Sequence, residues 1–197
     1  MAMKYCVGID EAGRGPLAGP VAVGVVKVPS DFDWGLIPGV GDSKQIAAEK
    51  REVLFSRAQY LRHHRQLDFA ISQVGAPVID ELGIVYAVNL AMQRCIKRLK
   101  LKPEECFIKL DGSLHAPPQF SQETIIKGDS LEPSIGLASI LAKVTRDRYM
   151  QRIARRYTQY SFEEHKGYGT KAHREAISKY GKCPIHRVSY CKNVKIL

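Results

Sequence analysis

The sequence predicts an α/β domain in which helices pack on a mixed β-sheet. Three observations support this fold class. Short apolar and β-branched runs come first along the chain, segments with helical periodicity interleave with further strand-like runs, and no linker rich in serine, glycine or proline divides the 197 residues. Such an order is typical of a sheet covered by helices. Because single hydrophobic cores stop growing near ~250 residues, we expect one domain over residues 1–197.

Five segments are predicted to form the sheet. Residues 5–9 are a short apolar run that ends at acidic residues and glycine, and the β-branched run 21–28 can pair with it as a hairpin partner. Residues 66–74 supply a third strand. Residues 106–110 and 124–126 are again short and strand-like, and an aspartate follows each of them within a few residues.

Three helices are predicted after the first strands. Between residues 84 and 99 the apolar side chains keep helical spacing on one face, which is typical of a buried stripe. Pro133 suits the first turn of a long helix that runs to about Tyr157. Thr170 can cap a further helix, which Gly181 ends. The helices after residue 141 form the basic C-terminal region discussed below.

Composition excludes several classes of protein. With 45% apolar and 25% charged residues, the chain has ordinary globular usage. No apolar run approaches the ~18 to 20 residues that span a bilayer, and Asp10 and Glu11 come before a signal-peptide core can form. Five cysteines without a C-x-x-C pair or partnered histidines argue against a disulfide framework and a zinc site. We therefore expect a cytoplasmic protein with free thiols and no membrane partner.

The positive charge is concentrated at one end of the chain. Residues 141–197 hold 14 Lys or Arg against 4 Asp or Glu, whereas residues 1–140 hold 16 of each, so the C-terminal region carries the whole net charge of +10. Lysines and arginines that displace counterions from phosphates bind nucleic acid without selecting a sequence. The alternative is a solvated basic surface without a ligand.

Carboxylates follow three of the predicted strands. Asp10 and Glu11 come directly after the first strand, Asp111 follows residues 106–110, and Asp129 follows the strand near residue 125. Ligands collect where strands end, and four carboxylates in one pocket repel one another unless protons or cations neutralise them. Oxygen ligands favour Mg²⁺ or Mn²⁺ over zinc. Each aspartate alone has a second interpretation as a turn or cap residue.

The segment between Gly13 and Gly19 superficially suggests a phosphate-binding loop. Its spacing differs from G-x-x-x-x-G-K-[ST], and Ala18 stands where the dinucleotide pattern G-x-G-x-x-G needs its third glycine. Glycines around one arginine instead allow the backbone to approach a bulky ligand, with Arg14 available for a phosphate.

Six motifs together resemble bacterial ribonuclease HII. They are GIDEAGRGPLAGPV at residues 8–21, DSK at 42–44, IDELGI at 79–84, ASILAKVTRD at 138–147, HKGYGT at 165–170 and PIHR at 184–187. In order they cover nearly the whole chain. The resemblance implies a ribonuclease H-like mixed sheet flanked by helices.

The resemblance also implies a role for individual residues. Asp10, Glu11, Asp111 and Asp129 match the four carboxylates of the family's catalytic and metal-binding site. Gly13, Arg14 and Gly15 match the family's loop that binds the ribonucleotide and its 2'-hydroxyl. Tyr168 matches a tyrosine that packs on the adjacent sugar. The matches to contacts with the nucleic-acid backbone are Lys44, Lys143 and Lys166. Asp147 belongs to a family motif, but a structural ion pair within its helix is the preferred interpretation, with a role as substitute fourth carboxylate kept open.

The activity implied is hydrolysis of the RNA strand of RNA–DNA hybrids and cleavage 5' to single ribonucleotides in duplex DNA. The enzyme would bind one ion of Mg²⁺ or Mn²⁺ without substrate and two ions with substrate. Hydrolysis with two bound ions would leave 3'-hydroxyl and 5'-phosphate ends. Type 3 ribonucleases H lack the Gly-Arg-Gly sequence and carry an extra N-terminal domain, so the loop at Arg14 favours type 2. Gly136 and Leu137 depart from the small alanines usual in the family. Residues 113–121, after Asp111, form a loop that also departs from the family pattern.

Two other functions remain as alternatives. A Holliday-junction resolvase or integrase of the same fold also has scattered carboxylates, but lacks the Gly-Arg-Gly loop and the His-Lys-Gly-Tyr segment. A non-catalytic nucleic-acid binder explains the basic region but not carboxylates at three strand ends, since these repel phosphate without a metal. The partners expected are a hybrid duplex and a DNA duplex containing ribonucleotides, bound by a monomer.

Overall fold

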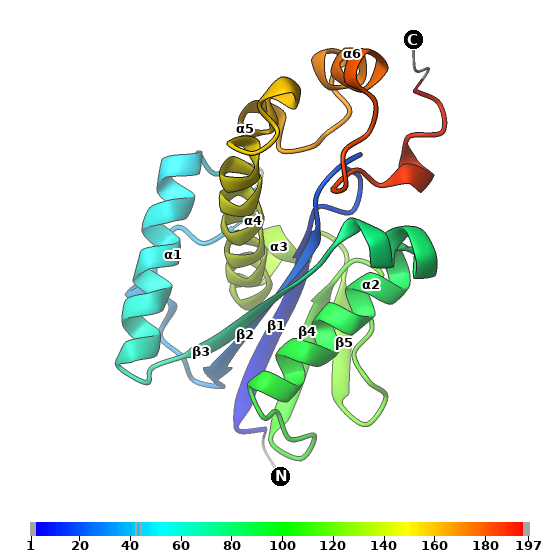
Figure 1. The fold of residues 1–197 in the computed structure, drawn as a ribbon. Coiled ribbons are helices and arrows are strands. Elements are labelled where there is room, and N and C mark those ends of the chain that lie inside the picture. Colours follow the sequence, from blue (N-terminus) through cyan, green and yellow to red (C-terminus); the bar gives the residue numbers. More distant parts are fainter. Residues whose placement is uncertain (1–2, 42, 44, 195–197) are drawn as a thin grey trace.

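The structure is a computed structural model that describes residues 3–41, 43 and 45–194. In this part of the chain five strands form one sheet in the order β3-β2-β1-β4-β5 (Figure 1). The strands are β1 (Tyr5–Ala12), β2 (Val21–Pro29), β3 (Asp68–Val74), β4 (Cys106–Asp111) and β5 (Ser121–Ile125). β1 and β3 run antiparallel to β2, whereas β1, β4 and β5 run parallel to one another. The predicted mixed sheet is confirmed.

The first strand is longer than its apolar run. β1 continues through the acidic residues because β2 still pairs with them, with Asp10 opposite Gly24 and Glu11 opposite Val23. Pairing with β4 stops earlier, at Ile9 opposite Leu110. The predicted end of the strand before Asp10 is therefore wrong for the pairing of β1 with β2. It is right for the pairing of β1 with β4. The acidic residues lie where β1 loses its parallel neighbour.

Helices cover both faces of the sheet (Figure 1). α2 (Ala76–Arg98) packs on one face with the side chains of Val7, Ile9 and Ile108, and α1 (Ala48–His63) and α4 (Pro133–Ala154) pack on the other. α4 lies directly on the strands: a side chain at Gly8 would come 2.1 Å from the Ser134 carbonyl carbon. This close approach places α4 against the end of β1.

Two helices differ from the sequence prediction. α1 was not predicted, although its buried residues Leu54, Phe55, Ala58 and Leu61 have helical spacing; the stripe is narrow and charged residues surround it. α2 begins well before residue 84, and a kink at Gly83 (φ 83°) separates its first turns from the predicted stripe. α4 begins at Pro133 as predicted and ends at Ala154.

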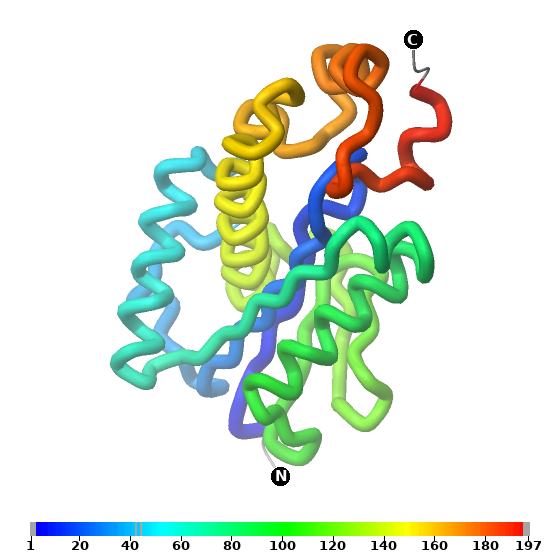
Figure 2. The backbone as a smooth tube through the Cα atoms, in the orientation of Figure 1, coloured from blue at the N-terminus to red at the C-terminus, as the bar shows by residue number. Residues whose placement is uncertain are grey.

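The C-terminal segment packs on the loop between β1 and β2 (Figure 2). It contains the 3-10 helix η2 (Thr158–Tyr160), α5 (Phe162–His165), α6 (Lys171–Tyr180) and the 3-10 helix η3 (Val188–Tyr190); the remaining short elements are η1 (Trp34–Leu36) and α3 (Gly128–Leu131). The Thr170 hydroxyl caps α6 by accepting from the His173 N–H at 3.3 Å, as expected. The expected basic helical region is present up to Tyr180, and residues 181–194 add only the short 3-10 helix η3.

Within these described residues, no helix combines the length and the apolar character needed to cross a membrane.

Candidate active site

The parallel pairing of β1 and β4 brings three carboxylates to one edge of the sheet. Asp10 and Glu11 lie beyond the last β1–β4 pair, and Asp111 is the final residue of β4. Asp10 is 5% exposed, and its side chain is bonded to Ser139 of α4. The carboxyl ends of parallel neighbours meet at the same sheet edge, so the topology assembles the cluster.

Electrostatic repulsion within this cluster is strong. Burial raises the pKa of Asp10 well above its ordinary value, and the charges of Glu11 and Asp111 raise it further. Hydrogen bonds from Ser139 and from the Glu11 N–H, the latter at 2.7 Å, lower the pKa in part. Burial also raises the pKa of Glu11, although its carboxylate accepts from Arg14 at 3.2 Å. The ionised pair is therefore costly in the absence of a cation.

Asp129 follows a glycine whose backbone contacts Asp111. The Gly128 N–H donates to Asp111 Oδ1 at 2.7 Å, and Asp129, the next residue, is buried in the first turn of α3. Lys127 in the left-handed conformation (φ 57°) turns the chain from β5 into this helix. Asp129 thus lies one residue beyond a contact with Asp111, in a short helix instead of at a strand end.

The donor set suits a hard cation. Glu11 Oε2 is buried and has no hydrogen-bond partner among the described residues, which leaves one oxygen available as a ligand. Within the same residues, no three His, Cys, Asp or Glu side chains already form a group that can hold an ion. An ion at this edge therefore requires side-chain adjustment, and all candidate ligands are oxygens, which suits Mg²⁺ or Mn²⁺.

A pocket of about 210 Å³ opens beside Glu11. Its lining residues are Glu11, Ala12, Gly13, Arg14, Gly15, Ser43, Ser139, Lys143 and Tyr168. Five of these, from three separate motifs, are substrate contacts predicted from the sequence. Ser43 and Ser139 were not predicted as site residues, although both stand in the motifs; their hydroxyls are 2.8 Å apart and link the pocket wall to Asp10.

The remaining predicted lysines lie around an adjoining pocket or outside the described residues. Lys143 and Lys166 both line a second pocket of about 260 Å³ beside Arg51 and Asp147. Lys44 lies outside the residues that the structure describes. Lys143 therefore links the two pockets.

Asp147 forms ion pairs within the protein. Its carboxylate lies 2.8 Å from Lys143 Nζ and 3.8 Å from Arg51 Nη2. Arg51 also donates to the Ser43 carbonyl at 2.8 Å. The expected structural ion pair is present, with Lys143 and Arg51 as partners, whereas Arg148 pairs with Glu52.

Two buried histidines hold the backbone of Tyr168. His173 Nδ1 lies 2.9 Å from the Tyr168 carbonyl, which only accepts, so this nitrogen carries the proton. In the neutral ring Nε2 is then an acceptor, and His186 Nε2, at 3.1 Å, must donate to it. His186 Nδ1 in turn accepts from the Cys183 N–H at 2.9 Å. The hydrogen bonds thus fix one tautomer for each ring.

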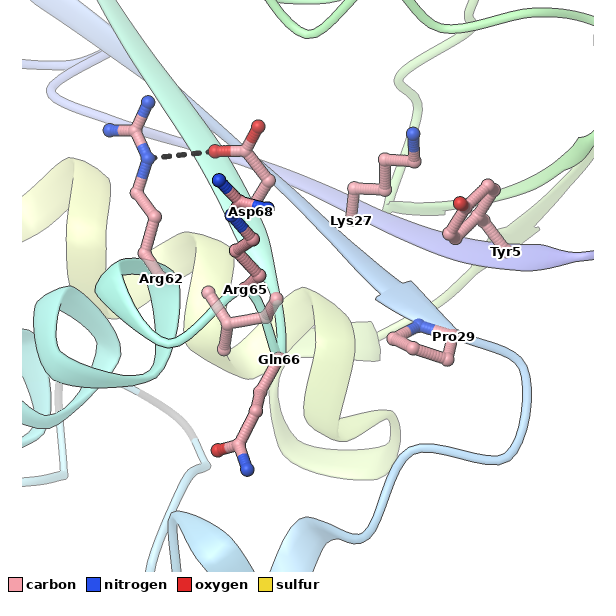
Figure 3. A pocket seen from close by; sticks show the side chains of 8 residues that line it. Tyr5, Lys27, Pro29, Arg62, Arg65, Gln66 and Asp68 are labelled. Atoms are coloured by element: carbon pink, nitrogen blue, oxygen red, sulfur yellow. Dashed lines mark ion pairs between the residues drawn. The ribbon is translucent and has the colours of Figure 1, made fainter.

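A further pocket, of about 280 Å³, lies at the other end of the sheet, where β1 begins (Figure 3). Figure 3 shows the Arg62–Asp68 ion pair (2.7 Å) on one side and Lys27 and Tyr5 on the other. It contains none of the predicted site residues and only one carboxylate. We therefore place the candidate active site at the Asp10 edge.

Residues 7–193 match the family model described as ribonuclease HII. The chain belongs to the ribonuclease HII family. It is 48% identical over 183 residues to a ribonuclease HII of Endomicrobium trichonymphae, with 93% of this chain and 83% of the relative covered. As a member it is a type 2 ribonuclease H, an endoribonuclease for RNA–DNA hybrids.

Solved structures support the same fold. The ribonuclease H2 of Pyrococcus horikoshii OT3 superposes with a TM-score of 0.72 at 27% identity, covering 94% of this chain and 93% of that chain. A structure of Bst-RNase HIII in complex with Mn²⁺ has a TM-score of 0.65 at 18% identity, and the match covers 90% of this chain but 63% of that one. The likeness to the second structure concerns the fold alone.

Proposed function

We propose that this ribonuclease HII hydrolyses the RNA strand of hybrids and also nicks duplex DNA 5' to a single embedded ribonucleotide, leaving 3'-hydroxyl and 5'-phosphate ends. Asp10, Glu11, Asp111 and Asp129 serve as catalytic metal ligands. The observation that carries the proposal is the buried, unpartnered Glu11 oxygen beside two repelling aspartates, at the mouth of a pocket lined by the Gly-Arg-Gly loop.

The cofactor proposed is Mg²⁺ or Mn²⁺, one ion without substrate and two with it. The all-oxygen donor set and the repulsion between Asp10, Glu11 and Asp111 support a hard cation. When bound, two such ions supply an activated nucleophile and neutralise charge on the phosphorane and the leaving oxygen.

The pocket residues provide binding and orientation. Arg14 lies 38% exposed beside Glu11, where its guanidinium can reach a phosphate, and Lys143 lies on the border of both pockets. Lys44 and Lys166 further contact the nucleic-acid backbone in this proposal. Gly13 and Gly15 allow the chain to approach the ribose closely, and Tyr168, 43% exposed, presents its ring to the neighbouring sugar.

The proposed setting is a monomer in the cytoplasm with one catalytic domain. Its partners are RNA–DNA hybrids and DNA duplexes that contain ribonucleotides, and its role is to remove embedded ribonucleotides and primer RNA. The excess of basic residues beyond residue 140 supports a nucleic-acid partner.

The test uses three end-labelled duplexes of one length: DNA with one ribonucleotide, a full RNA–DNA hybrid, and DNA alone. We expect Mg²⁺ or Mn²⁺ to permit cleavage of the first two only, with a 3'-hydroxyl at the nick, and EDTA to stop cleavage while binding remains measurable. Cleavage that persists in EDTA, or cleavage of the all-DNA duplex, would contradict the proposal.

A further inference from the structure

Two arginines lie fully buried beneath the loop of residues 13–20. Arg146 of α4 and Arg187 of the C-terminal segment are each 0% exposed. Among the described residues neither forms an ion pair with Asp or Glu. Their guanidinium groups donate instead to backbone carbonyls, and five of the six acceptors belong to the 13–20 loop.

The arrangement is energetically unfavourable by itself. A buried charge without a counterion is costly even when hydrogen-bonded. Burial, and then repulsion by Arg146, lower the pKa of Arg187 to about 10. Arg146 Nη1 is buried and has no partner among the described residues. A loop held in this way has its conformation strongly specified, which is the property that a selective binding loop needs.

The carbonyls bound by Arg187 determine where the neighbouring N–H groups point. Arg187 Nη2 donates to the Gly13 carbonyl and Nη1 to the Arg14 carbonyl, both at 2.7 Å. In a trans peptide the C=O of one residue and the N–H of the next point in opposite directions. The N–H groups of Arg14 and Gly15 therefore point away from the buried guanidinium, and within the described chain neither has an acceptor.

Gly13 faces the buried side of the loop, and Gly15 faces its exposed side. Gly13 has φ +90°, and a Cβ there would lie 2.1 Å from Arg146 Nε. The first glycine is therefore required by the buried arginine. At Gly15 a Cβ would meet nothing within 4 Å, and the residue is exposed. The second glycine leaves room for an external ligand.

We propose that Arg187, supported by Arg146, is a positioning residue for ribonucleotide selection: it binds the Gly13 and Arg14 carbonyls and thereby orients two adjacent N–H donors toward the 2'-hydroxyl oxygen of the substrate. The inference rests on the proposed function. Arg146 extends the arrangement to the turn that carries Tyr168, because it donates to the Lys166 carbonyl at 2.9 Å and its Cζ lies 5.7 Å from the Tyr168 ring centre.

The test compares Arg187→Lys with wild type and with Arg148→Lys, a matched control at a half-exposed arginine of α4. Lysine keeps the charge but cannot donate to both carbonyls in the fixed geometry of guanidinium. Two quantities are measured: the single-turnover rate of cleavage at one embedded ribonucleotide, and the affinity for ribonucleotide-free DNA of the same length. We expect Arg187→Lys to lower the rate roughly 10- to 100-fold, the scale of one to two hydrogen bonds from a charged group, and to change the DNA affinity less than about 2-fold.

A parallel loss of rate and DNA affinity, or an unchanged rate in a folded variant, would overturn the inference. If wild type itself does not cleave the ribonucleotide duplex, the proposed function fails instead, so the two failures are distinguishable.

A second measurement does not depend on the variant folding. In EDTA, the wild-type Arg14 and Gly15 amide protons should exchange rapidly and become protected by the ribonucleotide duplex, but not by the all-DNA duplex. Equal protection by both duplexes, or protection of neither amide, would contradict the orientation that we assign.

Discussion

At the residue level, Asp10 combines a cost to stability with the proposed chemistry. Its carboxylate is buried, its pKa is raised well above the ordinary value, and Glu11 and Asp111 contribute to that shift. A carboxyl group with a raised folded-state pKa weakens the fold at every pH above its ordinary pKa, where the unfolded chain has already lost the proton. Metal ligands that repel one another are expected to show this opposition between stability and function.

The first prediction is that Asp10→Asn abolishes turnover and raises the metal-free melting temperature. The amide removes the charge that Glu11 and Asp111 repel, and its oxygen can still accept the Glu11 N–H bond seen at 2.7 Å. Activity under saturating Mn²⁺ should fall below ~1% of wild type, because metal ligation supplies several kcal/mol to the transition state. Calorimetry in EDTA and a nicking assay check the two parts. Substantial residual activity would remove Asp10 from the metal site.

The second prediction separates the two loop glycines. Gly13→Ala should destabilise the protein by at least ~2 kcal/mol, because φ is +90° and the new methyl group meets Arg146. Gly15→Ala should change stability by less than ~0.5 kcal/mol, since its surroundings are open, while still lowering activity. Urea unfolding of both variants is the measurement. Equal stability losses would show that the two glycines do not face opposite sides.

At the element level, the segment from α5 to η3 packs on the loop of residues 13–20 and supplies Tyr168 to the pocket. Lys166 and Gly167 both have positive φ (51° and 85°), and this turn directs Tyr168 to the pocket. The Tyr168 carbonyl is held by His173, which is held by His186. The position of the tyrosine thus depends on neutral histidines.

The third prediction is a loss of stability in mild acid. Burial lowers the pKa of His173 and of His186 to about 4, so the unfolded chain, whose histidines titrate near ~6.5, binds protons first as the pH falls. Stability should therefore decline from about pH 6.5 toward pH 4. Urea midpoints at pH 7 and pH 5 measure the decline. His186→Asn should reduce it, whereas His115→Asn, at an exposed loop position, should leave it unchanged.

The fourth prediction concerns the ring of Tyr168. If the ring packs on a sugar, Tyr168→Phe should keep most activity, whereas Tyr168→Ala should lose ~1 to 3 kcal/mol, about 5- to 150-fold in rate. The loss should be larger on the single-ribonucleotide duplex than on a long hybrid, where a neighbouring ribose offers another register. Equal losses on both substrates, with a lower melting temperature, would show that Tyr168 only anchors its loop.

At the level of the whole molecule, the C-terminal region that holds the net positive charge folds back to the loop between β1 and β2. The basic C-terminal segment passes from α4 through α5 and α6 and returns to the loop between β1 and β2 (Figure 2). Lys171 is exposed, and its ion pair with Glu175 is long at 3.9 Å. Such lysines are available to a polyanion that enters the pocket.

The fifth prediction is that charge reversal of Lys166, Lys171 and Arg174 weakens binding to any duplex. The log-log salt slope should flatten by about one unit for each phosphate that the protein no longer neutralises. Reversal of Arg65 at the distal pocket of Figure 3 is the matched control and should leave the slope unchanged. An equal change of the salt slope for the Arg65 variant and for the Lys166, Lys171 and Arg174 variants would indicate general electrostatic attraction instead of a defined duplex-binding surface.

Much of the fold and of the candidate site follows from sequence patterns. The positions of β2, β3 and α4 and the cap at Thr170 depend on local periodicity and turn chemistry. The helix α1 was missed because its apolar stripe is narrow. The extension of β1 to Ala12 was missed because a polar residue joins a strand only when a neighbour pairs with it.

The sequence by itself determined the family motifs, the carboxylates near the strand ends and the charge of the C-terminal region. Only the tertiary structure decided which groups support them: Ser139 beside Asp10, the paired histidines behind Tyr168, and Arg187 beneath Gly13. The reason is physical. Local propensity depends on neighbours along the chain, whereas a buried arginine or histidine is given its role by partners that folding brings from distant positions.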